Sequence, residues 1–125
     1  MSKLSRLYAV LLVAGGGFLG ASTRYAVDLL FGSTLMSTLF TNVLGSFALG
    51  LLLYESLNIG HTPEYVRLAA ATGFLSSFTT FSTFITDLVV VSPLSALGYL
   101  IASYVLGFTA VIVSKTIIDQ LLVQT

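Results

Sequence analysis

The sequence predicts an all-α membrane protein with four transmembrane helices, the third of which is broken. Two observations support this fold class. First, the chain is 56% hydrophobic and only 8% charged, whereas a soluble domain has about a quarter of its residues charged. Second, its uncharged runs approach the length of about 20 residues that a membrane-spanning helix needs; they cover residues 7–23, 29–54, 68–86 and 88–114. We therefore expect residues 1–125 to form one transmembrane domain.

Composition also excludes several function classes. The chain of 125 residues has no cysteine, one histidine and a formal net charge of zero, which excludes disulfides and thiolate metal sites and gives no reason to expect nucleic acid. The glycine-rich segment 15–20 follows no predicted strand and lacks a P-loop lysine. His61 lies in a predicted loop, so no Ser-His-Asp set can be assembled around it. We expect that the protein is not an enzyme.

The first predicted span covers about residues 5–30. Its glycines, at 15–17 and at 20, would allow a neighbouring helix to approach closely, which is how helices associate in membranes. Arg24 lies late in this span, and Asp28 follows four residues later, where the two side chains can pair on one helix face. We interpret Arg24 as a structural or interfacial cation and not as a ligand.

The second predicted span covers about residues 34–56 and carries Asn42. An amide at membrane depth needs partners. One alternative is a hydrogen bond to another helix, worth roughly 0.6–2 kcal/mol; the other is donation of its N–H to an anion. Thr38 precedes Asn42 by four residues and shares its helix face.

The third predicted span covers about residues 64–91 and contains the segment around which the chain is organised. Phe78, Phe81 and Phe84 recur every three residues, and the hydroxyl-bearing residues between them compete with the helical backbone for hydrogen bonds. We predict that the helix is interrupted here. Broken backbone at membrane depth survives only where it is buried in protein or lines a watery cavity.

The aromatic rings of this segment suggest a way to hold an anion without full positive charge. A phenyl ring has a positive edge, so the edges of Phe81 and Phe84 could face a small anion beside the hydroxyls of Thr80 and Thr83. Such a weak field suits conduction, because an ion must leave as readily as it enters. We interpret Asp87, which ends the uncharged run, as an ordinary interfacial carboxylate.

The fourth predicted span covers about residues 93–115. Tyr99, Ser103 and Gly107 follow one another at intervals of four and form one stripe along the helix. The remaining tail reads as a short amphipathic extension.

Three segments together resemble the Fluc (CrcB) fluoride channel family, and the resemblance covers essentially the whole chain. Residues 79–84, Thr-Thr-Phe-Ser-Thr-Phe, are similar to the TTFSTF signature of that family. Residues 37–45 resemble its G-T-L-x-x-N-x-x-G segment, with Ser37 in place of the first glycine. The first span carries a similar G-A-x-x-R pattern that ends at Arg24.

The resemblance implies a fluoride-specific channel that lets fluoride leave the cell passively and so lowers its toxicity. It implies an antiparallel, dual-topology dimer in the plasma membrane, which we expect to be bacterial, with two fluoride pathways built from both subunits. The pathway residues would be Asn42, Phe81, Phe84, Thr38, Thr80, Ser82, Thr83, Tyr99 and Ser103. A structural Na⁺ at the dimer interface would be held by the backbone carbonyls of Ser76 and Thr79.

The charge distribution bears on the identity of the second subunit. Four spans place both termini on one side of the membrane, and four of the five Lys and Arg residues then lie on that side, with Arg24 near the other. The positive-inside rule favours cytoplasmic termini. Such a bias leaves open a heterodimer with an oppositely oriented paralogue, in which this chain could be a non-conducting partner. The family resemblance favours the homodimer.

A small four-span multidrug/proton antiporter is the rival interpretation. That class couples protons through a carboxylate within its first helix. Here no glutamate precedes Glu55, and the first acidic residue, Asp28, lies at the end of the first span.

Overall fold

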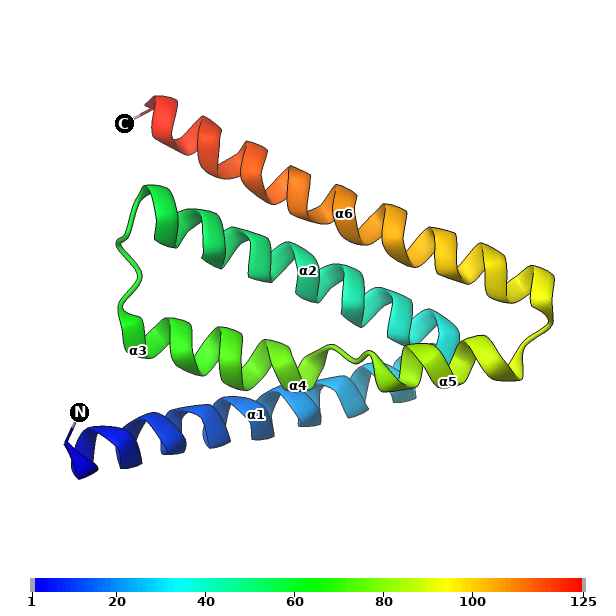
Figure 1. Cartoon of the computed structure of the whole chain (residues 1–125), viewed down its shortest axis with the longest axis horizontal. Helices are drawn as coiled ribbons and strands as arrows, with labels where there is room; N and C mark the ends of the chain where they lie inside the picture. Colours follow the sequence, from blue (N-terminus) through cyan, green and yellow to red (C-terminus); the bar gives the residue numbers. More distant parts are fainter. Residues whose placement is uncertain (1, 125) are drawn as a thin grey trace.

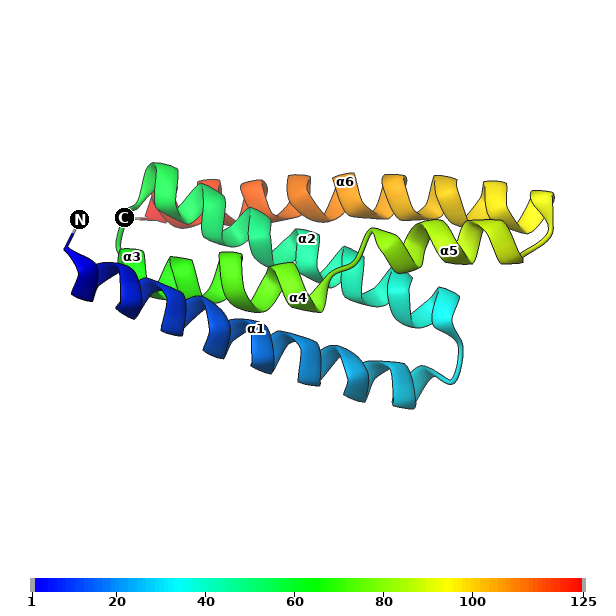
Figure 2. The same cartoon turned by 60° about the horizontal axis from the view of Figure 1, so that its bottom comes forward.

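The computed structural model describes residues 2–124, and throughout that range it contains helices and no strand. Its long rods are α1 (Lys3–Phe31), α2 (Thr34–Asn58), an interrupted third rod and α6 (Pro93–Gln124). Four helices are long and apolar enough to cross a membrane by length and composition. Figures 1 and 2 show both chain ends and the connection from α2 to α3 at the same end of the bundle. The predicted four-span architecture is therefore confirmed.

The third rod contains the predicted interruption. It consists of α3 (Glu64–Arg67), the π-helix η1 (Leu68–Leu75), α4 (Ser76–Phe78) and α5 (Ser82–Val90), with non-helical residues 79–81 between the last two. Figure 1 shows this gap as an extended stretch in the middle of the rod.

Side-chain hydroxyls accompany the break, as the sequence predicts. Thr79 is extended, with φ −85° and ψ 163°, and its Oγ1 donates to the carbonyl of Leu75 at 2.8 Å. The Ser76 hydroxyl bonds back to the carbonyls of Thr72 and Gly73. The π-helical turn before the break is a feature that the sequence did not predict.

Glycines bring α1 into backbone contact with η1. A Cβ added at Gly16 would overlap the carbonyl oxygen of Ala69, and one added at Gly20 would overlap that of Phe74. A Cβ at Gly73 would come within 2.8 Å of the carbonyl oxygen of Val13. The close approach that we expected from the glycines of the first span therefore occurs, and it supports the rod just before its break.

A second close contact joins α2 to α6. A Cβ at Gly50 would lie 2.5 Å from the Ser114 hydroxyl, which donates to the carbonyl of Phe47 at 3.0 Å. Beyond the expected end of the fourth span at residue 115, α6 continues as a helix to Gln124. An exposed ion pair, with 2.7 Å between Lys115 Nζ and Asp119 Oδ2, lies on this continuation.

Candidate functional site

A cavity of about 510 Å³ lies beside the break, between α2, the third rod and α6. Polar groups from the break and from both neighbouring helices reach its wall, beside aromatic rings. The predicted site residues that line it are Asn42, Ser76, Thr79, Thr80, Phe81, Phe84 and Ser103. The predicted residues Thr38, Ser82, Thr83 and Tyr99 do not line it.

Asn42 is bound to the broken backbone by two hydrogen bonds. Its Nδ2 donates to the carbonyl of Thr80 at 2.8 Å, and its Oδ1 accepts the backbone N–H of Thr80 at 2.8 Å. Gly45, one turn later on α2, allows this approach, because a Cβ there would overlap Cγ2 of Thr79. An amide carries two N–H donors, and the bond to Thr80 uses one of them. Asn42 therefore stabilises the non-helical backbone at Thr80, and its second amide N–H remains available to a ligand in the cavity.

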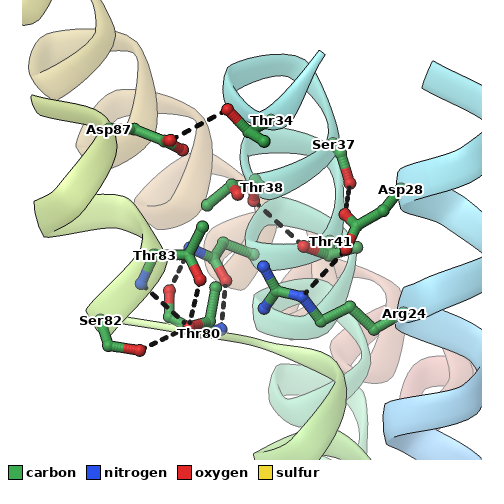
Figure 3. A network of polar contacts seen from close by, with 11 residues as sticks. Arg24, Asp28, Thr34, Ser37, Thr38, Thr41, Thr80, Ser82, Thr83 and Asp87 are labelled. Atoms are coloured by element: carbon green, nitrogen blue, oxygen red, sulfur yellow. Dashed lines mark hydrogen bonds and ion pairs between the residues drawn. The ribbon is translucent and has the colours of Figure 1, made fainter. Parts of the chain in front are cut away.

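Ser82 and Thr83 belong to the start of α5. The Thr80 hydroxyl accepts the backbone N–H of Thr83 at 3.3 Å and also lies 3.3 Å from the hydroxyls of Ser82 and Thr83. Figure 3 shows these three side chains gathered at the first turn of α5. The Thr80 hydroxyl thus accepts an N–H of the first turn of α5, much as a capping side chain does. Of these three residues only Thr80 lines the cavity.

The break also leaves two backbone carbonyls, of residues that line the cavity, without their usual helical partners. In an unbroken helix the carbonyls of Ser76 and Thr79 would accept from the N–H groups four residues later, which are those of Thr80 and Thr83. Here these donors are bound by the Asn42 side chain and the Thr80 hydroxyl instead. Unwound carbonyls of this kind suit Na⁺, so Ser76 and Thr79 fit the cation that the family resemblance implies. Two carbonyls do not complete a coordination shell.

The two phenylalanines of the predicted pathway lie in different environments. Their ring centroids are 5.9 Å apart, but Phe81 is 68% exposed whereas Phe84 is 5% exposed. The ring of Phe84 lies 5.3 Å from that of Tyr99 and meets the ring of Tyr104 edge-on, at 6.3 Å and 80°. Phe84 therefore separates the cavity from the group around Tyr99.

Behind Phe84 lies a cluster of buried polar atoms. Thr38 Oγ1, Asp87 Oδ2 and the Tyr99 hydroxyl are all buried without a hydrogen-bond partner in the described part of the chain. The Tyr99 hydroxyl lies near both Thr38 and Asp87. Buried polar groups of this kind normally bind a water molecule or an ion. Ser103 Oγ is also buried and has no hydrogen-bond partner in the described part of the chain, and Ser103 lines the cavity.

Asp87, interpreted as an ordinary interfacial carboxylate, is not a solvated side chain. Asp87 is 4% exposed, and its Oδ1 accepts a hydrogen bond from Thr34 Oγ1 at 3.0 Å (Figure 3). A sequence signal existed, since Asp87 follows Phe84 by three residues and so shares its helix face. Tyr104 and Phe108, which also line the cavity, were missed as well.

Arg24 and Asp28 form the predicted pair on α1. Arg24 Nε lies 3.8 Å from Asp28 Oδ2, and the hydroxyl of Ser37 on α2 donates to Asp28 Oδ1. Figure 3 shows Arg24 extending from α1 toward the turn of α2 that carries Thr41.

These features define a polytopic membrane protein with a mainly apolar cavity, reached by a few polar groups, at an interrupted helix, the architecture of a channel or transporter. The family described as "CrcB-like protein, Camphor Resistance (CrcB)" matches residues 11–115. The Fluoride-specific ion channel FluC 1 of Haloarcula marismortui is 47% identical over 87% of this chain and 84% of the relative. FluC 1 of Natronomonas pharaonis is 44% identical, with 88% and 93% covered. FluC 2 of Methanosarcina acetivorans is 35% identical, with 90% and 88% covered.

The chain therefore belongs to the CrcB family, to which the Fluc resemblance pointed. Its relatives are named as ion channels, so the family is one of transport proteins and not of enzymes.

Proposed function

We propose that this chain is a fluoride channel subunit that lets fluoride leave the cell passively down its gradient. The observation that carries the proposal is the convergence of Asn42, Thr80, Phe81 and Phe84 on one cavity at the break, in a chain whose relatives are named fluoride-specific channels. Fluoride trapped in the cytoplasm after entry as neutral hydrogen fluoride would be the ion exported. The plasma membrane is the corresponding location.

The chemistry of the cavity suits a small, strongly hydrated anion. The free N–H of Asn42, the Ser103 hydroxyl and the positive edges of Phe81 and Phe84 replace water without a full positive charge. Weak, distributed donors allow release as well as binding. The buried hydroxyls of Thr38 and Tyr99, beyond Phe84, would extend the pathway away from the cavity. Thr80, with its partners Ser82 and Thr83, would fix the geometry of the turn between these two regions.

We infer that the working channel is an antiparallel dimer. The exposure of Phe81 and the two freed carbonyls, of Ser76 and Thr79, leave the site incomplete in one subunit. A second four-helix subunit that covers the cavity would contribute the matching set. A structural Na⁺ would then bind at the interface through the carbonyls of both subunits.

The partner is either a second copy or an oppositely oriented paralogue. The homodimer is our preferred proposal because residues 11–115 match the family, whose resemblance implies a homodimer. The names FluC 1 and FluC 2 among the relatives fit genomes with two such chains, which keeps the heterodimer as the second candidate.

The test is fluoride efflux from liposomes that contain the purified chain alone, followed with a fluoride electrode, with chloride efflux measured in parallel. We expect fluoride to leave rapidly and chloride to be retained. Retention of both ions would contradict the homodimeric channel and support the non-conducting partner. Efflux that depends on an imposed proton gradient would support the antiporter.

A further inference from the structure

Arg24 is the one cation between Arg6 and Arg67 in the sequence, and its charge is not free. Asp28, one turn later on α1, lies against it at 3.8 Å. Asp28 is in turn fixed by Ser37, a fully buried residue of α2, whose hydroxyl donates to Oδ1. The side chains therefore form a chain of contacts from α1 to α2, which Figure 3 shows.

This contact chain lies next to the proposed ion pathway. Ser37 is adjacent in sequence to Thr38, and both are fully buried in the same turn of α2. Figure 3 shows the Arg24 side chain reaching toward the turn of α2 that carries Thr41, one turn after Thr38. The charge of Arg24 therefore acts on the polar cluster behind Phe84, and Asp28 opposes it at short range.

We propose that Asp28, positioned by Ser37, limits the positive potential that Arg24 exerts on the ion pathway, and so sets how strongly anions are drawn into it. The inference rests on the proposed fluoride conduction. An anion channel gains from a nearby cation on entry but loses on release if the cation binds too tightly. The carboxylate of Asp28 weakens the attraction between Arg24 and the anion, and the Arg24 guanidinium keeps its position.

The size of the effect follows from Coulomb's law. For a separation of about 10 Å between the removed negative charge and the anion, and an effective dielectric constant between about 20 and 80, the local concentration of the anion changes roughly two- to seventeenfold. Salt screens the effect, since the Debye length falls from about 30 Å at 0.01 M to about 8 Å at 0.15 M.

The test is the initial fluoride efflux rate of liposomes carrying Asp28→Asn, at subsaturating fluoride and at 0.01 M and 0.15 M ionic strength (about 30 Å and 8 Å of screening). We expect a roughly two- to seventeenfold increase at low salt and a smaller one at high salt. In an Arg24→Gln background fluoride efflux should start from a lower rate, and the same substitution should raise it by a similar factor, because the contributions of the two charges add. Asp28→Glu, which keeps the charge, should behave like the wild type.

Asp119→Asn is the matched control. Asp119 forms the same type of i,i+4 pair, with Lys115, and its substitution changes the net charge identically, but it lies on the exposed continuation of α6. An increase of equal size in Asp119→Asn, or an Arg24→Gln rate equal to or above that of the wild type, would overturn the inference. So would a rate for Asp28→Asn equal to or below that of the wild type. Asp28→Ser replaces Asp28→Asn if the latter does not elute as a folded protein.

Failure of this inference is distinguishable from failure of the proposed function. If wild-type liposomes release no fluoride, the proposed function fails. If they release fluoride and the Asp28 variants match the wild type, only the role of Asp28 fails.

Discussion

Replacement of Asn42 by alanine should both destabilise the fold and stop fluoride flux. The side chain forms two hydrogen bonds of 2.8 Å with the backbone of Thr80, at a point where the helix supplies no partner. Alanine leaves a carbonyl and an N–H without partners in a part-buried position. It also removes the amide donor that we assign to the anion.

The magnitude follows from those two groups. An unsatisfied buried donor or acceptor costs about 1–3 kcal/mol, and the part-buried position of Thr80 favours the lower half of that range. Loss of both bonds should therefore cost about 2–4 kcal/mol. Asn58 offers a matched control, because its amide makes one exposed bond to the carbonyl of Tyr54 within α2. Asn58→Ala should cost about 0.5 kcal/mol, the lower end for one hydrogen bond.

The measurements are thermal unfolding in detergent and fluoride efflux from liposomes, on both variants. We expect Asn42→Ala to unfold at a clearly lower temperature than Asn58→Ala and to lose flux, while Asn58→Ala keeps it. Equal unfolding temperatures would refute the structural role of Asn42. A stable Asn42→Ala variant without flux would mean that the amide acts on the ion alone.

Two further substitution pairs test the packing that supports the break and the unequal roles of the rings. Gly20→Ala should cost about 1–3 kcal/mol by overpacking against the backbone of Phe74, whereas Gly15→Ala, with no atom within 4 Å of its added Cβ, should not destabilise; equal thermal shifts would argue against the α1–η1 contact. Phe84→Ala should cost about 3–5 kcal/mol because the ring is buried, whereas Phe81→Ala should leave unfolding nearly unchanged and still reduce fluoride efflux. Wild-type efflux in Phe81→Ala would remove that ring from the pathway.

The sequence was sufficient for the four spans and for the break. Four apolar runs, each close to the length of a membrane span, predict a helical membrane protein. The many hydroxyl side chains after residue 78 compete with the helical backbone for hydrogen bonds and so predict the break. The need of Asn42 for a polar partner was also implied, because an amide at membrane depth cannot stay unpaired, but the sequence did not identify the backbone of Thr80 as that partner.

Other features depended on contacts that local patterns do not encode. The π-helical turn of η1 accompanies backbone contact with α1, and no residue preference marks it. The spacing of Asp87 from Phe84 did place it on the buried face of α5, but the hydrogen-bond partner of its carboxylate, Thr34, lies 53 residues away in sequence and could not be read from a local pattern. Tyr104 and Phe108 are ordinary lipid-facing residues by composition, and only the position of α6 beside the break brings them to the cavity.

The central claim is that fluoride passes through the cavity beside the break, and filling that cavity tests it most directly. Gly107 lines the cavity, whereas Gly98, on the same helix, has no atom within 4 Å of an added Cβ. We predict that Gly107→Phe abolishes fluoride efflux from liposomes while Gly98→Phe conducts like the wild type, with both proteins eluting as the wild type does in detergent. Undiminished fluoride efflux through Gly107→Phe would contradict the claim.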